Sequence, residues 1–166
     1  MSFALLIFVT LQRLVELAIA RRNSQRLIAE GAVEIGAGHY PLLVLLHSAW
    51  LGALWILVLS GQAAVWWPAV IGYVVVELAR IWVMASLGRY WTTRILVPRE
   101  APLVRRGPYR FLRHPNYWVV AFEIALLPLA LGSWTLALVF SLLNAAVLFR
   151  RIRVEEGSLA PRRKTA

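Results

Sequence analysis

Long apolar runs separated by short polar segments dominate the chain. The runs cover residues 3–20, 40–59, 63–87, 116–131 and 134–149. A helix of about 20 apolar residues is long enough to cross a bilayer. The pattern therefore predicts an all-α integral membrane protein, a single domain with about five transmembrane helices.

The last two apolar runs are shorter than the others. Each has 16 residues, and a helix of that length spans about 24 Å, against about 30 Å of hydrocarbon in a bilayer. Only Gly132 and Ser133 separate the two runs. We predict a tight C-terminal helical hairpin, extended by polar helix at its cytoplasmic ends. A re-entrant hairpin is the alternative.

The composition supports a membrane protein and removes several kinds of chemistry. Hydrophobic residues make up 60% of the chain, and charged residues only 16%, against roughly a quarter in soluble proteins. The chain has no cysteine and no aspartate, which excludes disulfides, cysteine-ligated metals, a cysteine nucleophile and Asp-based phosphoryl transfer. His39 and His47 are too few for a haem or di-iron site, so we assign both a structural role and predict no metal.

A net charge of +10 would suggest nucleic-acid binding in a soluble domain, but the basic residues follow the membrane pattern. Sixteen of the 18 lie between the first and second runs, between the third and fourth, or after the fifth. These segments share one side if all five helices cross, and the positive-inside rule makes that side cytoplasmic. We predict a bacterial inner-membrane protein with its N-terminus outside. Its arginines contact membrane lipids, and no nucleic acid is involved.

Two charge pairs lie inside the apolar runs. Arg13 and Glu16 are three residues apart, and so are Glu77 and Arg80. Charges at membrane depth are costly and usually pair with one another or face a polar cavity. We favour a role in fastening the first helix to the third over a role in substrate binding, because neither pair is near the basic loop.

The chemical signal is concentrated in the loop at residues 88–115 and the tail at residues 150–166. Gly107 and Pro108 predict a turn, and Pro115 suits the first position of the next helix. Arg151 and Glu155 are four residues apart and share a helix face. Because a hairpin returns the chain to its starting side, these two should meet His114 and Tyr117 at one cytoplasmic mouth. Tyr90, Trp91 and Trp118 are typical of an interfacial aromatic belt.

The order and spacing of these motifs resemble one known family. Gly107-Pro108-Tyr109, Arg113-His114-Pro115 and Tyr117, followed after a hydrophobic hairpin by Arg151 and Glu155-Glu156, resemble the isoprenylcysteine carboxyl methyltransferases, which are integral-membrane enzymes that use S-adenosylmethionine. Further segments are similar to a bacterial branch associated with type III polyketide synthases, whose members O-methylate alkylpyrones. These segments are Gln12 to Glu16, Gly38 to Pro41, Leu87 to Trp91, and Asn116 to Val120 with Glu123.

The resemblance implies S-adenosylmethionine as cofactor and a lipophilic small-molecule acceptor, a long-chain alkylpyrone or a related polyketide hydroxyl. It also implies that Arg151, facing the acceptor, and Glu155, holding the cofactor, are the catalytic residues. The cofactor-binding residues that it implies are Leu103, Val104, Tyr109, His114, Pro115, Asn116, Tyr117, Glu155 and Glu156. Trp118-Val119 departs from the family's usual small residue, and we expect this bulk to disfavour a branched farnesyl thioether.

Three alternatives stay open at this point. The first is methylation of isoprenylcysteine itself. The second is an NADPH-dependent reductase of the sterol-reductase type, which has a similar His-x-Asn-Tyr pattern but is typically longer. The third is a non-enzymatic scaffold or small transporter built around Glu16, Glu77 and Glu123, which leaves the clustered cytoplasmic motifs without a role.

Overall fold

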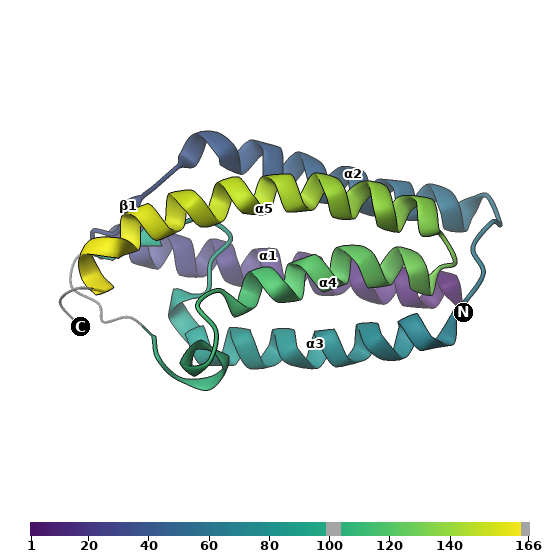
Figure 1. Cartoon of the computed structure of the whole chain (residues 1–166), viewed down its shortest axis with the longest axis horizontal. Coiled ribbons are helices and arrows are strands. Elements are labelled where there is room, and N and C mark those ends of the chain that lie inside the picture. Colours follow the sequence, from purple (N-terminus) through teal and green to yellow (C-terminus); the bar gives the residue numbers. More distant parts are fainter. Residues whose placement is uncertain (99–103, 164–166) are drawn as a thin grey trace.

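Five long helices run along one axis and form the body of the protein (Figure 1). The computed structural model describes residues 1–98 and 104–163, with side chains described as far as residue 158. The long helices are α1 (Ser2–Ala29), α2 (Tyr40–Leu59), α3 (Trp67–Leu87), α4 (Pro115–Ala130) and α5 (Trp134–Arg163). Helix α4 packs against both α3 and α5. Short 3-10 helices are η1 (Ala37–His39), η2 (Gly88–Tyr90) and η3 (Gly107–Arg110), and the strands are β1 (Val33–Glu34) and β2 (Leu96–Val97).

The helices have the length and surface of a membrane protein. Four spans in the described chain are long and apolar enough to cross a bilayer: Ser2–Ala29, Ala37–Leu59, Trp67–Tyr90 and Trp134–Ser158. The 16-residue α4 is apolar but shorter. Large apolar side chains such as Leu14, Leu78 and Leu142 lie on the outside of the bundle, as expected where lipid is the solvent. The prediction of an all-α integral membrane protein is confirmed.

Several helix ends differ from the sequence prediction. Helix α1 continues nine residues beyond the predicted end at residue 20, because Arg21, Arg22 and Arg26 lie on its exposed face while Asn23 and Leu27 are buried. Helix α5 continues as polar helix as far as residue 163, which agrees with the predicted extension of the hairpin. Helix α2 has the predicted bounds, and α4 begins at Pro115 as predicted and ends one residue before the predicted end.

Helix α3 begins at Trp67 rather than at residue 63, because the preceding residues bond to another turn. The amides of Ala64 and Trp66 donate to the carbonyls of Leu131 and Ala130, at 3.1 and 3.0 Å. Gly132 has a φ of 81°, and a Cβ there would lie 2.6 Å from the Ala64 oxygen. The α2–α3 and α4–α5 connections are thus joined at the end of the bundle that carries the N-terminus (Figure 1).

At the opposite end, two short strands connect polar segments that are far apart in sequence. Strand β1 pairs antiparallel with β2, with Val33 opposite Val97 and Glu34 opposite Leu96. An ion pair of 2.9 Å joins Arg94 to Glu34. The α1–α2 connection is therefore fixed to the segment that follows α3, a contact that the sequence pattern did not predict.

The two intramembrane charge pairs merge into one cluster with a residue from a third helix. Arg13 reaches Glu16 at 2.7 Å, Glu77 at 2.9 Å and Glu123 at 3.1 Å. Arg80 bonds to Glu16 at 3.1 Å and also pairs with Glu123. We call these five residues the ionic cluster. It fastens α1 to both α3 and α4, and each charge in it has an opposite charge within bonding distance.

We expect Glu123→Gln to destabilise the protein strongly. Glu123 is 3% exposed and contacts both guanidiniums, and removing one partner of a buried pair typically costs about 3–5 kcal/mol. Thermal unfolding of the detergent-solubilised protein measures the change. The control is Glu30→Gln, which breaks an exposed pair with Arg89 and should cost less than about 1 kcal/mol. Equal losses in the two variants would contradict this role of the cluster.

Candidate active site

The loop that carries the sequence motifs, which we call the motif loop, packs closely against the end of α3 at Gly107. Gly107 has a φ of 58°, and a Cβ there would overlap the Ser86 hydroxyl. The adjacent Arg106 donates through Nε to the Ser86 carbonyl at 2.8 Å. The next residues form η3, which carries Tyr109, and Pro115 then occupies the first turn of α4 as predicted.

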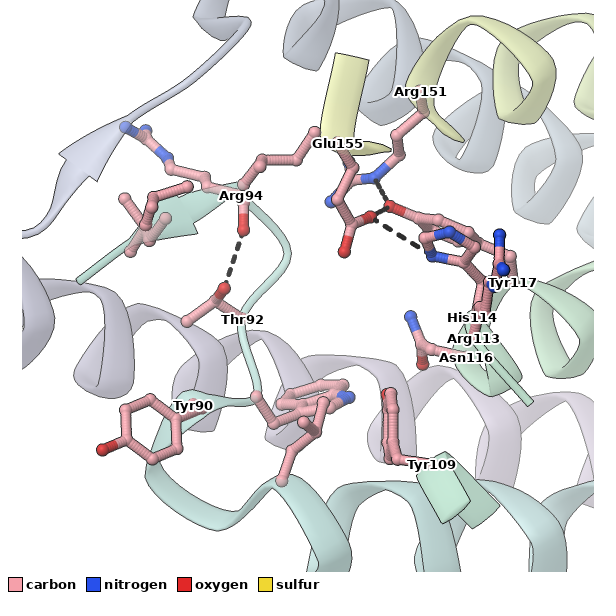
Figure 2. A pocket seen from close by; sticks show the side chains of 15 residues that line it. Tyr90, Thr92, Arg94, Tyr109, Arg113, His114, Asn116, Tyr117, Arg151 and Glu155 are labelled. Atoms are coloured by element: carbon pink, nitrogen blue, oxygen red, sulfur yellow. Dashed lines mark hydrogen bonds and ion pairs between the residues drawn. The ribbon is translucent and has the colours of Figure 1, made fainter. Parts of the chain in front are cut away.

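A polar cluster forms where the start of α4 meets α5. The Tyr117 hydroxyl accepts a hydrogen bond from Arg151 Nε at 3.0 Å and donates to the Glu155 carboxylate. The His114 ring stacks on Tyr117 with centroids 5.4 Å apart, and its Nε2 lies 3.3 Å from a Glu156 oxygen. Figure 2 shows Arg151, Glu155, Tyr117 and His114 converging from the two helices. The predicted convergence of the motif loop and the tail is confirmed.

These side chains form one wall of an open cleft of about 680 Å³, which we call the mouth cleft. The predicted site residues that line it are Tyr109, His114, Asn116, Tyr117, Arg151 and Glu155 (Figure 2).

The remaining predicted cofactor-binding residues are not among those that line the mouth cleft. Leu103 lies outside the described residues. Val104 is partly buried and Pro115 is buried, and neither lines the cleft. Pro115 instead starts α4. Glu156 does not line the cleft, but it contacts His114, which does.

The opposite wall comes from residues 90–97, which lie in the loop predicted to form the mouth but were not among the predicted site residues. Trp91 is only 4% exposed, so its assignment to an aromatic belt is wrong. The Asn23 amide holds this segment by donating to the Trp91 carbonyl at 2.8 Å. The sequence signal that could have identified this wall is the run Tyr90-Trp91-Thr92-Thr93, two aromatic residues and two threonines directly after a helix. The additional lining residues are Leu87, Tyr90, Trp91, Thr92, Arg94, Ile95, Leu96, Val97 and Arg113.

Two polar atoms in the cleft wall are left for a ligand. Asn116 Oδ1, an acceptor, and Trp91 Nε1, a donor, are buried and have no hydrogen-bond partner among the described residues. An unsatisfied buried polar atom costs about 1–3 kcal/mol, so a ligand that bonds to these atoms gains affinity. Burial also raises the pKa of Tyr109, which keeps its hydroxyl neutral and able to donate. The cleft therefore suits a ligand with an aromatic surface and several polar groups.

A second cavity of about 1020 Å³ continues from the mouth cleft between the helices, and we call it the membrane pocket. Both cavities share Trp91, Thr92, Asn116, Tyr117 and Arg151. Beyond this shared wall the lining is mostly apolar, and it includes Leu17, Leu43, Val44, Leu51, Val120 and Leu148.

The ionic cluster contributes to this pocket through Arg13, Glu16 and Arg80. The charge pairs therefore fasten helices and also line a cavity. The sequence analysis favoured the first of these roles over the second. His47, to which we assigned a structural role, also lines the membrane pocket.

Trp118 and Val119 do not line this pocket, so the expectation that their bulk disfavours a branched farnesyl thioether loses its structural basis. Trp118 is 57% exposed and stacks on Phe122 on the outside of α4. Val119 points the other way and packs in a core cluster with Ala20 and Val83. The helical spacing places both beside the pocket wall rather than in it.

Arg151 lies where the two cavities meet, and it is 6% exposed. Its Nε donates to Tyr117 and its Nη2 donates to the Thr93 carbonyl at 2.7 Å. Within the described part of the chain it forms no ion pair with a carboxylate. A buried cation that bonds only to neutral groups favours an anionic oxygen nearby.

Comparison with known proteins gives a family match for the part of the chain that holds the mouth cleft. The sequence model of the isoprenylcysteine carboxyl methyltransferase family matches residues 69–161. Every residue that lines the mouth cleft lies in this range. The membrane pocket also uses residues 13–51, which lie outside the match.

Two relatives extend over most of the chain. The uncharacterized protein YpbQ of Bacillus subtilis is 38% identical over 162 residues, which cover 96% of each chain. An uncharacterized protein of Haemophilus influenzae is 28% identical over 152 residues, covering 89% of this chain and 88% of the relative.

Proposed function

Because this chain belongs to the isoprenylcysteine carboxyl methyltransferase family of membrane methyltransferases, we propose that it transfers a methyl group from S-adenosylmethionine to a hydroxyl of a lipophilic acceptor. The observation that carries the proposal is the pair of cavities that meet at Tyr117 and Arg151. One cavity is polar and lies within the family match, and the other is apolar and enters the membrane.

The mouth cleft fits the methyl donor by its chemistry. An adenosine needs an aromatic surface and hydrogen-bond groups, which Trp91, Tyr109 and Asn116 offer. The donor's amino acid part and sulfonium need charges of both signs, which Glu155 and nearby arginines offer. When bound, S-adenosylmethionine supplies an activated methyl group on sulfur. The protein's task is then to orient the acceptor oxygen, exclude water and stabilise negative charge on that oxygen.

The membrane pocket suits the acceptor. Leu17 of α1 and Val44 of α2 line it and are still 50% and 44% exposed, which supports an opening between these helices toward lipid. A long alkyl tail then stays in the bilayer while the polar head reaches Arg151. Lateral entry avoids moving the tail into water, which costs about 0.8 kcal/mol per methylene.

We propose a long-chain alkylpyrone or a related polyketide hydroxyl as this acceptor. Two of the segments that resemble the alkylpyrone-methylating branch supply Arg13, Glu16 and Tyr40 to the pocket wall. A hydroxypyrone is acidic enough to be largely ionised, and Arg151 is placed to bind the anion. We also propose that the mouth faces the cytoplasm of a bacterial inner membrane, because most of the basic residues lie at that end.

The identity of the cofactor is tested by measuring how much each candidate ligand stabilises the protein against unfolding. S-adenosylhomocysteine at one hundred times its dissociation constant should stabilise the solubilised protein by about 2.7 kcal/mol, by mass action. Thermal unfolding with and without the ligand measures this, with NADPH as the control. Stabilisation by NADPH alone would favour the reductase alternative instead.

Substitutions of Arg151 and Glu155 should have different effects on donor binding and turnover, although the two residues lie one helical turn apart. Glu155→Gln should weaken S-adenosylhomocysteine binding, because it removes the negative charge from the mouth cleft. Arg151→Ala should leave that binding nearly unchanged and abolish most turnover. Calorimetric titration and a labelled-methyl assay separate the two effects, and an equal loss of donor affinity in both variants would refute the division of roles.

The acceptor class is tested by offering two lipids in parallel. With labelled S-adenosylmethionine, the purified protein should methylate a long-chain alkylpyrone, with rates that fall steeply as the tail is shortened. Farnesylcysteine is the competing acceptor in the parallel assay. Preferential methylation of farnesylcysteine would overturn the alkylpyrone assignment and leave the methyltransferase proposal standing.

A further inference from the structure

His47 is an ionisable side chain in the membrane pocket to which the proposed chemistry gives no role. It lies on α2, in the second turn of the helix, outside the residues that the family match covers. It lines the same cavity as Arg151 and Tyr117. Its ring points back toward the mouth, because Nδ1 lies 2.9 Å from the carbonyl oxygen of Leu43, one turn nearer the start of α2.

This contact determines which ring nitrogen carries the proton. A carbonyl oxygen only accepts, so Nδ1 is the protonated nitrogen and the neutral ring presents the lone pair of Nε2. Among the described residues, the ring makes no second hydrogen bond. His47 thus offers a hydrogen-bond acceptor, and a base, in a pocket whose other side-chain nitrogen groups are guanidinium, amide or indole donors.

We propose that His47 accepts the proton of the acceptor's hydroxyl as that oxygen is methylated. This inference rests on the proposed function and adds a catalytic residue to it. It extends the acceptor class to hydroxyls that keep their proton at neutral pH, such as phenols. An acceptor that arrives ionised does not need this step.

The step balances in atoms and charge. The acceptor's O–H bond breaks and its proton moves to Nε2 of His47. The new O–CH₃ bond forms as the S–CH₃ bond breaks, with the bonding electrons of the latter left on sulfur. The positive charge moves from the sulfonium to the imidazolium, which then releases its proton to water through the mouth.

Charged groups of both signs surround the ring. The ionic cluster contains three glutamates and two arginines, a formal charge of −1, and it forms part of the same pocket. Of its carboxylates only Glu16 lines the pocket, together with Arg13, Arg80 and Arg151, so the lining charges favour the neutral ring, which is the form that accepts a proton. The titratable groups that line the pocket with His47 are Arg13 and Glu16 of α1, Tyr40 of α2, Arg80 of α3, Tyr117 of α4 and Arg151 of α5.

The test compares two acceptors that carry the same long alkyl tail, a 4-hydroxy-2-pyrone and a phenol. The full-length protein in lipid nanodiscs receives labelled S-adenosylmethionine and each acceptor in turn. His47→Phe should slow methylation of the phenol by about 100-fold and methylation of the ionised pyrone by less than about threefold, since general bases contribute 10²-fold or more only where a proton must leave. Leu45→Phe, at a 66% exposed position of the same helix and outside the pocket lining, is the matched control and should change neither rate.

Binding without the donor gives a second readout. The unmodified protein should bind the phenol about tenfold more tightly than its methyl ether, the factor expected of one buried hydrogen bond. His47→Phe should remove this preference. His47→Asn, which keeps an acceptor oxygen but is not a base, should retain part of the preference and still methylate the phenol slowly.

Each outcome decides the assignment. Equal losses for the pyrone and the phenol in His47→Phe would show a structural role and overturn it, and so would a wild-type protein that methylates only the pyrone. A wild-type protein that methylates neither acceptor would overturn the proposed function itself.

Discussion

The need to pair charges inside a membrane determines how this bundle is assembled. Arg13, Glu16, Glu77, Arg80 and Glu123 are mutually compensating, and separating any one helix leaves a charge unpaired in a low-dielectric environment. The cluster therefore places α1 against α3 and α4. Since three of its members also line the membrane pocket, the same interaction that joins the helices determines one wall of the cavity.

The second organising feature is the Tyr117 hydroxyl. It bonds to both Arg151 and Glu155, so it ties the first turn of α4 to the polar end of α5. Arg151 in turn reaches the Thr93 carbonyl, on the segment that follows α3. One hydroxyl and one guanidinium thus connect three segments around the boundary of the two cavities, which is where we propose that the methyl group is transferred.

The two cavities also divide the chain. All the lining of the mouth cleft lies in residues 69–161, which match the family, whereas the membrane pocket adds residues of α1 and α2. A shared donor needs the same surface in every member of a family, while different acceptors need different walls. This division gives a physical reason to look for acceptor specificity in the first 51 residues.

The sequence by itself determined the helical class, because apolar runs of membrane length leave few other structures in lipid. It also predicted the bounds of α2, the start of α4 at a proline, and the convergence of His114, Tyr117, Arg151 and Glu155. These follow from local patterns and from a hairpin that returns the chain to its starting side. Family motifs are short and contiguous, so they were visible before any contact was known.

Only the tertiary structure decided the rest. The wall at residues 90–97 depends on β1 meeting β2 across 60 residues, and two-residue strands leave no periodic signal. Glu123 joins the ionic cluster, and His47 enters the pocket, through helix rotations that are set by packing against distant helices. The sequence indicated that Trp118 and Val119 are unusually bulky, but only the orientation of α4 showed that they lie beside the pocket rather than in it.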